Sequence, residues 1–252
     1  MKRLFALLIF PAVLLPLALS AQTPQHPAVD HRTVPYVPAP RSEWLGSFSG
    51  ISINGHMQVR IIKNSADEGP RITYDTQGDM STKFRASVGR NGILKIEEPI
   101  DTKRTSVTQV TLWCNDIASL SVTGADLTFD SVIEREMFDL EVAGGANVTA
   151  KFNVADLAVS ATGRSTLVVE GTAKYLRLDI STAKFDGLDL DTVSSIVEAS
   201  HASEVMLSVS ERLEGVTSTS AKISYKGSPR ILRAHTTLFG GDISPVVQPS
   251  VQ

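Results

Sequence analysis

Residues 120–129 have the sequence Leu120-Ser121-Val122-Thr123-Gly124-Ala125-Asp126-Leu127-Thr128-Phe129, and the second half of this pattern returns five more times. In each copy a small residue is followed two positions later by an apolar residue, and mostly by another two positions after that. The small residues are Ala125, Ala146, Ser165, Ala183, Ser203 and Ala221. A second short apolar segment, also expected to point inward, precedes each copy: 120–122, 140–142, 157–159, 176–178, Ile196 and 213–216. This even spacing, with a period of about 20 residues, predicts a β-solenoid, whose coils bury their inward side chains only against neighbouring coils.

The small residues predict a column along the solenoid, at the point where the chain turns inward and a larger side chain would not fit. Successive coils would stack about 4.8 Å apart. A β-sandwich of hairpins is the alternative, because it also consists of short strands joined by turns. A sandwich does not require the same class of residue at the same phase in six copies, so the period favours the solenoid.

The segments before this repeat also alternate between apolar and polar residues. In 51–53 and 57–61 the apolar side chains are expected to point to one side. Asn54-Gly55 predicts a tight hairpin turn between these two segments, and 89–92 predicts another between later strands. No segment keeps a helical period with caps for three turns. The chain is therefore predicted to be all-β, with N-terminal strands and hairpins before the solenoid.

Residues 1–21 form the predicted signal peptide. Lys2 and Arg3 precede an apolar stretch that two prolines interrupt, and small residues at 18–21 provide a cleavage site. The stretch is too short and too broken for a membrane span, although an N-terminal anchor that is never cleaved is the alternative. The chain is predicted to be exported to the periplasm, the outer membrane or the extracellular medium, with no transmembrane span after the leader is removed.

Three further segments follow the leader. Residues 22–43 contain five prolines and predict an extended spacer with no core of its own. Residues 44–230 form the predicted solenoid domain, and 231–252 its C-terminal cap and tail. Cys114 is the single cysteine of the chain, so no internal disulfide can form. Its strand-like surroundings predict a small core residue rather than a nucleophile.

Five segments, taken in order, resemble a known family. They are Phe48-Ser49-Gly50-Ile51-Ser52-Ile53-Asn54-Gly55, Val59-Arg60-Ile61, Gly92-Ile93-Leu94-Lys95-Ile96, Leu120-Ser121-Val122-Thr123-Gly124-Ala125-Asp126 and Val142-Ala143-Gly144-Gly145-Ala146. Over roughly residues 45 to 228 the chain resembles the "putative auto-transporter adhesin head GIN domain", a family of exported bacterial proteins of unassigned function. The resemblance implies a right-handed parallel β-helix-like solenoid with coils of about 20 residues, and it brings no catalytic residues. The turns at 162–164 and 200–202 depart from the family's small-Gly pattern, which leaves their geometry open.

Charge and composition exclude several classes of partner. The formal charge is −3, and about −5 without Lys2 and Arg3, with no basic stripe that could bind a phosphate backbone. The histidines lack ligand spacing for zinc, and the Gly-rich aspartate repeats of calcium-binding β-rolls are missing. We therefore expect no nucleic acid, no metal and no cofactor.

Polar side chains follow the small residues of the repeat and predict a solvated outer face. In order they are Asp126, Asn147, Thr166, Lys184, Glu204 and Lys222. No aromatic platform for sugar rings lies beside this row in the sequence. Asp126, Asn147, Lys184, Glu204 and Lys222 are the candidate binding residues, with a surface polysaccharide or an envelope protein as partner. The leading hypothesis is a non-catalytic, adhesin-like binding or structural module.

A polysaccharide lyase or hydrolase on the same scaffold is the alternative function. Such an enzyme needs two carboxylates about 5–9.5 Å apart. The candidates are Asp179, Asp186, Asp189 and Asp191, of which the last two lie at i and i+2, about 6.5–7 Å apart on one strand face. Self-association is a further prediction, through an uncapped coil or an edge strand at 48–53.

Overall fold

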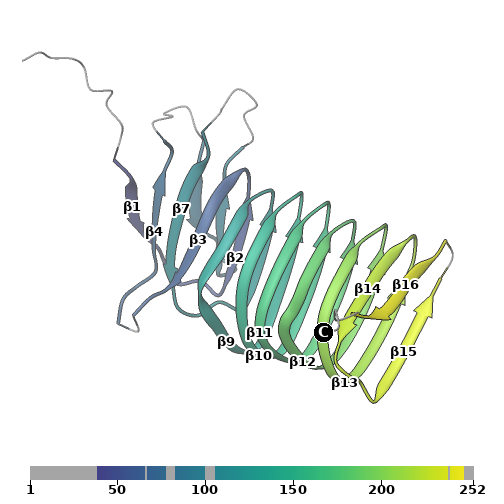
Figure 1. Ribbon diagram of the computed structural model, residues 1–252. Helices are drawn as coiled ribbons and strands as arrows, with labels where there is room; N and C mark the ends of the chain where they lie inside the picture. Colours follow the sequence, from purple (N-terminus) through teal and green to yellow (C-terminus); the bar gives the residue numbers. More distant parts are fainter. Residues whose placement is uncertain (1–38, 66, 78–82, 100–105, 238, 247–252) are drawn as a thin grey trace, which may run out of the picture. The chain divides into compact units, whose positions relative to one another are not determined.

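The computed structural model describes residues 39–65, 67–77, 83–99, 106–237 and 239–246. Within these residues every regular element is a strand, as predicted. The expected signal peptide at 1–21 and most of the expected spacer at 22–43 lie outside the described residues. The strands (Figure 1) are β1 (Arg41–Trp44), β2 (Gly50–Asn54), β3 (Met57–Lys63), β4 (Arg71–Asp75), β5 (Arg85–Val88), β6 (Ile93–Glu97), β7 (Thr108–Cys114), β8 (Ser119–Thr123), β9 (Asp126–Ala143), β10 (Asn147–Thr162), β11 (Thr166–Ser181), β12 (Lys184–Ser200), β13 (Glu204–Thr217), β14 (Ala221–Lys226), β15 (Ile231–Thr236) and β16 (Gly241–Pro245).

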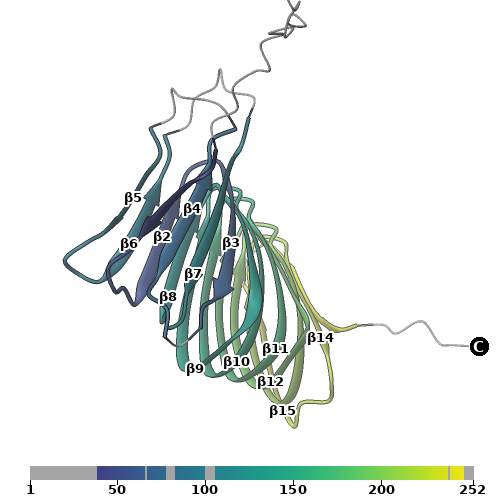
Figure 2. The same cartoon turned by 90° about the vertical axis from the view of Figure 1, so that its left-hand side faces the viewer.

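These strands wind into a parallel solenoid of about 7 turns with coils of about 19 residues. Each of the long strands β9 to β13 bends once, so that two walls of strands face each other (Figures 1 and 2). Wall A contains β7, β3, the first parts of β9–β13, β14 and β16. Wall B contains β6, β2, β8, the second parts of β9–β13, and β15. Parallel pairing between successive coils excludes the sandwich of hairpins.

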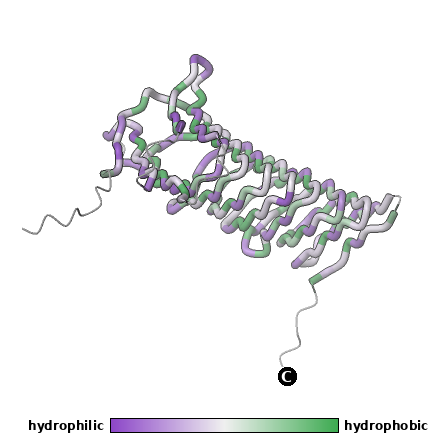
Figure 3. Tube along the Cα trace, turned by 90° about the horizontal axis from the view of Figure 1, so that it is seen from above, coloured by the Kyte–Doolittle hydropathy of each residue, from purple (hydrophilic) through white to green (hydrophobic). Residues whose placement is uncertain are grey.

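Inward side chains fill the space between the two walls. Hydrophobic and hydrophilic residues alternate along the strands (Figure 3), and most of the hydrophobic ones are buried. The six small residues of the repeat, from Ala125 to Ala221, are each at most 3% exposed, which confirms the predicted column. Full burial of one aliphatic side chain stabilises the fold by about 1.5–3 kcal/mol. Because each coil covers the next, this stabilisation exists only in the stack.

The turn from wall B back to wall A uses left-handed backbone in successive coils. Gly124 and Gly144 have φ values of 72° and 67°, where glycine has no steric penalty. Later coils place Arg164 (64°), His201 (52°) and Ala202 (57°) in the same conformation. The turns at 162–164 and 200–202, whose geometry the sequence left open, therefore contain the same left-handed conformation as the earlier turns. Each non-glycine residue there costs about 1–2 kcal/mol, which the packing of the coils offsets.

The turn at Asn54-Gly55 does not join a hairpin, so this prediction was wrong. Instead, β2 pairs in parallel with β6 and β8, and β3 pairs in parallel with β7 and β9. Gly55 has a φ of 135°, and a Cβ there would lie 2.2 Å from the carbonyl oxygen of Glu98. The close approach of another coil explains this glycine. The hairpin predicted at 89–92 is confirmed, because β5 and β6 pair antiparallel.

Strand β2 also has neighbours on both sides, so the expectation of an edge strand at 48–53 was wrong. The edges at the N-terminal end are β1 beside β4 in wall A and β5 beside β6 in wall B, and both are antiparallel to their neighbours. Strand β1 begins at Arg41, within the stretch that we expected to be spacer.

One strand of wall B is shifted by a residue relative to expectation. Ile196, expected inside, is 38% exposed, whereas Ser195 and Val197 are fully buried. The register shows the cause: Val168 pairs with Asp186 but Glu170 pairs with Asp189, so β12 contains one extra residue. Such a bulge moves every following side chain to the opposite face.

The stretch expected to cap the column, 231–252, contributes a further rung. Here β15 pairs in parallel with β13, and β16 pairs in parallel with β14. All six residues of β15 are exposed. Residues 247–252 lie outside the described part of the chain.

Candidate functional site

Wall A carries the polar row that the repeat predicts. Its members lie in register on successive strands, one strand spacing of about 4.8 Å apart, and the five candidate residues are exposed. The row is longer than the repeat indicated, because β7, β3 and β16 extend it at both ends. In order along the column it contains Gln109, Gln58, Asp126, Asn147, Thr166, Lys184, Glu204, Lys222 and Asp242. The structure therefore brings all five candidates into one line across the strands.

Neighbouring members of this row bind one another. Asn147 Nδ2 donates to Asp126 Oδ1 over 2.7 Å, and Lys184 Nζ forms an ion pair with Glu204 Oε2 at 2.8 Å. The hydrogen bond and charge of Lys184, together with the charge of Lys222, lower the pKa of the Glu204 carboxyl below its ordinary value. A ligand that binds these groups must therefore compete with pairs already formed between coils.

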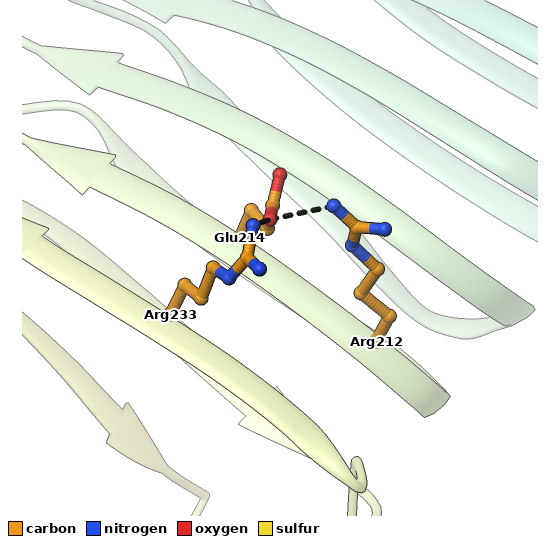
Figure 4. Close-up of polar contacts among 3 residues, drawn as sticks. All are labelled: Arg212, Glu214 and Arg233. Carbon is orange, nitrogen blue, oxygen red and sulfur yellow. Dashed lines mark hydrogen bonds and ion pairs between the residues drawn. The ribbon is translucent and has the colours of Figure 1, made fainter.

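Charged side chains pair between adjacent coils elsewhere as well. On wall A, Lys151 Nζ lies 2.7 Å from Glu170 Oε2. On wall B, Arg233 Nη1 from the last rung and Arg212 Nη2 both donate to Glu214 Oε1, over 2.6 and 2.7 Å (Figure 4). The hydrogen bond from Arg212 is the main cause that lowers the pKa of Glu214. Exposed pairs of this kind add little stability, but they position the outward side chains.

The N-terminal part of wall A is hollowed. Gln58, Gln109 and Asp126 from the polar row line a shallow groove with a volume of about 610 Å³. Arg60 and Asp130 also line it, and Arg60 Nε donates to Asp130 Oδ2. The groove therefore presents amide, carboxylate and guanidinium groups, with one cation already neutralised.

Aromatic side chains lie next to this groove, contrary to our expectation. Trp113 is on β7, four positions after Gln109 and on the same side of the strand. Antiparallel pairing places Arg71 of β4 opposite Trp113, and Trp44 of β1 opposite Arg71. The sequence did not reveal this group because β1 and β4 lie outside the repeat. The fact that the chain contains only two tryptophans was the available signal.

Wall B has a shallow groove of its own, with a volume of about 570 Å³. Small side chains such as Ser121 and Ser160 line it, together with Asp139, Glu141 and Arg177. The repeat gave no indication of this groove, because its members occupy the second strand of each coil, where we had identified only the inward residues.

The four aspartates of the enzymatic alternative do not gather into one cluster, although three of them lie on β12. Asp179 is on wall B, in register with Glu198, whereas Asp186 is on wall A. Asp189 and Asp191 share β12, and Asp191 Oδ1 accepts a hydrogen bond from Ser208 Oγ over 3.3 Å. In the part of the chain that the structure describes, no group of three or more His, Cys, Asp or Glu side chains could hold a metal ion.

Cys114 is a free, buried residue of the core, as predicted. Burial raises the pKa of its thiol to about 12. The reactive thiolate is therefore scarce at neutral pH, which does not suit a nucleophile.

The comparison with protein families identifies this architecture. A family model described as "Putative auto-transporter adhesin, head GIN domain" matches residues 47–229. The chain belongs to this family. The match to the adhesin-head family runs from just before β2 to just after β14, so it includes the polar row up to Lys222.

Solved structures share the fold of this chain. A putative adhesin from Bacteroides fragilis NCTC 9343 is 17% identical, with a TM-score of 0.74 over 82% of this chain and 96% of that one. A putative adhesin from Parabacteroides merdae ATCC 43184 is 13% identical, with a TM-score of 0.64 over 83% and 96%. A protein named putative lipid binding protein from Parabacteroides distasonis ATCC 8503 is 15% identical, with a TM-score of 0.63 over 83% and 96%. No curated protein matches the chain.

The described residues contain no helix that is long and apolar enough to cross a membrane.

Proposed function

We propose that this chain is a non-catalytic binding module of the bacterial envelope, which contacts a surface polysaccharide or an envelope protein through wall A. The observation that carries the proposal is the polar row from Gln109 to Asp242, in which hydrogen-bonding side chains recur on every rung in register. A row of this kind matches a partner that is itself extended and repetitive. The strands beneath it are rigid, so little ordering is needed on binding.

The family supports this proposal and its location. Its model is described as "Putative auto-transporter adhesin, head GIN domain", and two of the structures that share the fold carry the name "putative adhesin". In this proposal residues 1–21 direct export, and residues 22–43 act as a spacer between the solenoid and its point of attachment or release. Residues 44–230 supply the binding surface, and the domain acts in the periplasm, at the outer membrane or outside the cell.

The shape of wall A favours binding over turnover. An enzyme that acts on polysaccharides needs paired carboxylates beside the scissile bond. Asp179 and Asp186 lie on different walls, and no observation favours catalysis by Asp189 and Asp191. The open groove beside Gln58 and Gln109 also contains Asp126 and Asp130, but Asn147 already donates a hydrogen bond to the first carboxylate and Arg60 to the second.

Affinity retention with the immobilised full chain tests the proposal. The bait is offered fractionated envelope polysaccharide and envelope protein, and the test variant combines Asn147→Ala with Lys222→Ala on wall A. We expect this variant to retain at least about tenfold less partner, because hydrogen bonds to an exposed polar row are lost. The matched control combines Ser121→Ala with Ser160→Ala on wall B and should retain the wild-type amount.

Two outcomes would contradict the proposal. One is an equal loss of retained partner in the control variant, and the other is the release of new reducing ends from a retained polysaccharide.

Self-association is a separate proposal, through the exposed strand β15. Sedimentation of the full chain tests it, since a concentration-dependent dimer is expected to disappear when a proline replaces Ala234.

A further inference from the structure

Both tryptophans of the chain lie together on the outside of wall A, although they are far apart in the sequence. The guanidinium carbon of Arg71 lies 4.2 Å from the ring centroid of Trp113 and 5.8 Å from that of Trp44. Cross-strand pairing of β1, β4 and β7 holds the three residues in one row, which we call the Trp-Arg row. A guanidinium between two indole rings is positioned by their π faces.

The Trp-Arg row is half-buried at Arg71 and Trp113 and exposed at Trp44, and within the described residues its cation lacks an acidic partner. Trp44 is 70% exposed, so much of its ring is available to a ligand. Arg60, Arg135 and Arg233 each pair with a carboxylate of a neighbouring coil. Among the described residues Arg71 has no such partner, and its ring contacts leave its N–H groups free to donate. A planar guanidinium of this kind matches the two oxygens of a carboxylate.

Hydroxyl and amide groups continue from the Trp-Arg row toward the groove. Thr73 and Thr111 are paired across β4 and β7, two positions from Arg71 and Trp113. Gln109 follows after two more positions and belongs to the groove of about 610 Å³. The surface thus passes from an aromatic and cationic end to a polar, open end. This order suits a sugar chain, whose rings have apolar C–H faces and hydroxyl edges, better than a peptide that needs apolar side-chain pockets.

We propose that the Trp-Arg row and the adjoining groove bind an acidic glycan. The carboxylate of one sugar accepts hydrogen bonds from Arg71, and the apolar face of its ring packs on Trp44. Hydroxyls of the following sugars exchange hydrogen bonds with Thr111 and Gln109. This inference rests on the proposed binding function and narrows it to a ligand class and to one end of wall A.

The two tryptophans provide a direct probe, since no other residue of the chain contributes indole fluorescence. The full chain is titrated with a panel of uronate-containing oligosaccharides (galacturonate, mannuronate and glucuronate series) and with neutral oligosaccharides of equal length. We expect saturable changes in emission with at least one acidic series and none with the neutral ones. Binding should weaken with added salt, because an exposed ion pair is screened.

Calorimetric titration of variants then locates the site. Arg71→Gln should weaken binding about tenfold or more, the size expected for loss of a charge-assisted hydrogen bond. Trp44→Ala should weaken it roughly three- to tenfold, through loss of ring contact. Lys174 and Tyr175 form a matched exposed pair, with the ammonium 5.1 Å from the ring, so Lys174→Gln and Tyr175→Ala serve as controls and should bind as the wild type does. Circular dichroism checks that every variant keeps its fold.

If Arg71→Gln and Trp44→Ala bind the acidic glycan as tightly as the wild type does, the inference is wrong, but the proposed function still stands. Retention of an envelope protein or an acidic peptide, with no response to any uronate series, would overturn the inference in the same way. If the immobilised chain retains no polysaccharide and no protein from the envelope fractions, both the proposed function and the inference are wrong.

Discussion

The two ends of the solenoid are built differently. At the N-terminal end, β4 and β1 add antiparallel strands to wall A, and β5 adds one to wall B. Tyr74 of β4 stacks on Phe84, directly before β5, with ring centroids 4.3 Å apart, and both pack against the core. Ile72 of β4 is fully buried as a result. Antiparallel strands and an aromatic pair thus close this end.

At the C-terminal end, within residues 106–237 and 239–246, the last rung has a neighbour on one side only. Leu213 of β13 is fully buried, whereas Leu232, its register partner in β15, is 45% exposed. The two residues are of the same type and at the same phase of the coil. Burial in this fold is therefore decided by whether another coil follows. The free edge of β15 is also the place where another strand could pair.

The largest expected effect contrasts alanine substitutions at the two ends. Ile72→Ala should lower the free energy of unfolding by about 2–5 kcal/mol, because a buried side chain leaves a cavity. Leu232→Ala should lower it by about 1 kcal/mol or less, since nearly half of that side chain is already in water. Urea unfolding of the full chain, followed by circular dichroism, measures both.

The control for this contrast is Leu213→Ala, one coil before Leu232. It should cost about 2–5 kcal/mol, like Ile72→Ala. If Leu232→Ala proved as costly as Leu213→Ala, the last rung would be covered in solution and the contrast between the ends would not hold.

A smaller effect is expected on the rate at which Cys114 is labelled. This rate reports local unfolding near the N-terminal end of the solenoid. The thiol of Cys114 is buried, with a pKa raised to about 12, so labelling by a disulfide reagent at pH 8 should be slow in the native protein. Ile72→Ala should accelerate labelling about tenfold or more, because a destabilised end opens more often. Leu232→Ala should leave the labelling rate unchanged; equal acceleration by both variants would mean that the whole column opens as one unit.

The smallest effect concerns the ion pair between Lys184 and Glu204, midway between the ends. The folded protein lowers the pKa of Glu204, so the pair stabilises the fold above the unfolded carboxyl's ordinary value of 4.5. That contribution is lost as pH falls through the lower, folded pKa. Both side chains are more than half exposed, so Lys184→Met should cost only about 0.2–1 kcal/mol at pH 7. Unfolding curves of wild type and variant should converge in strong acid, and a constant difference at every pH would assign the effect to packing instead.

Much of the fold could be predicted because its elements repeat. The phase of Ala146 and Ser165 predicted both the inner column and the outward row that follows it, and the structure confirms that geometry. Ile196 shows where the repeat misleads, because one extra residue in β12 turns its side chain outward. Asn54-Gly55 is a second case, since a tight turn in a solenoid can serve a corner as well as a hairpin.

The sequence by itself determined the coil length, the inward and outward direction of most side chains, and the line formed by Asp126 and its successors. These properties depend on alternation and spacing over a short stretch of chain, which a single coil already contains. Only the tertiary structure decided that β4 runs antiparallel to the column and β1 antiparallel to β4, that β15 is left exposed, and that Trp44, Arg71 and Trp113 meet. Such contacts join strands from distant parts of the chain, and their direction and order leave no periodic trace in the residues themselves.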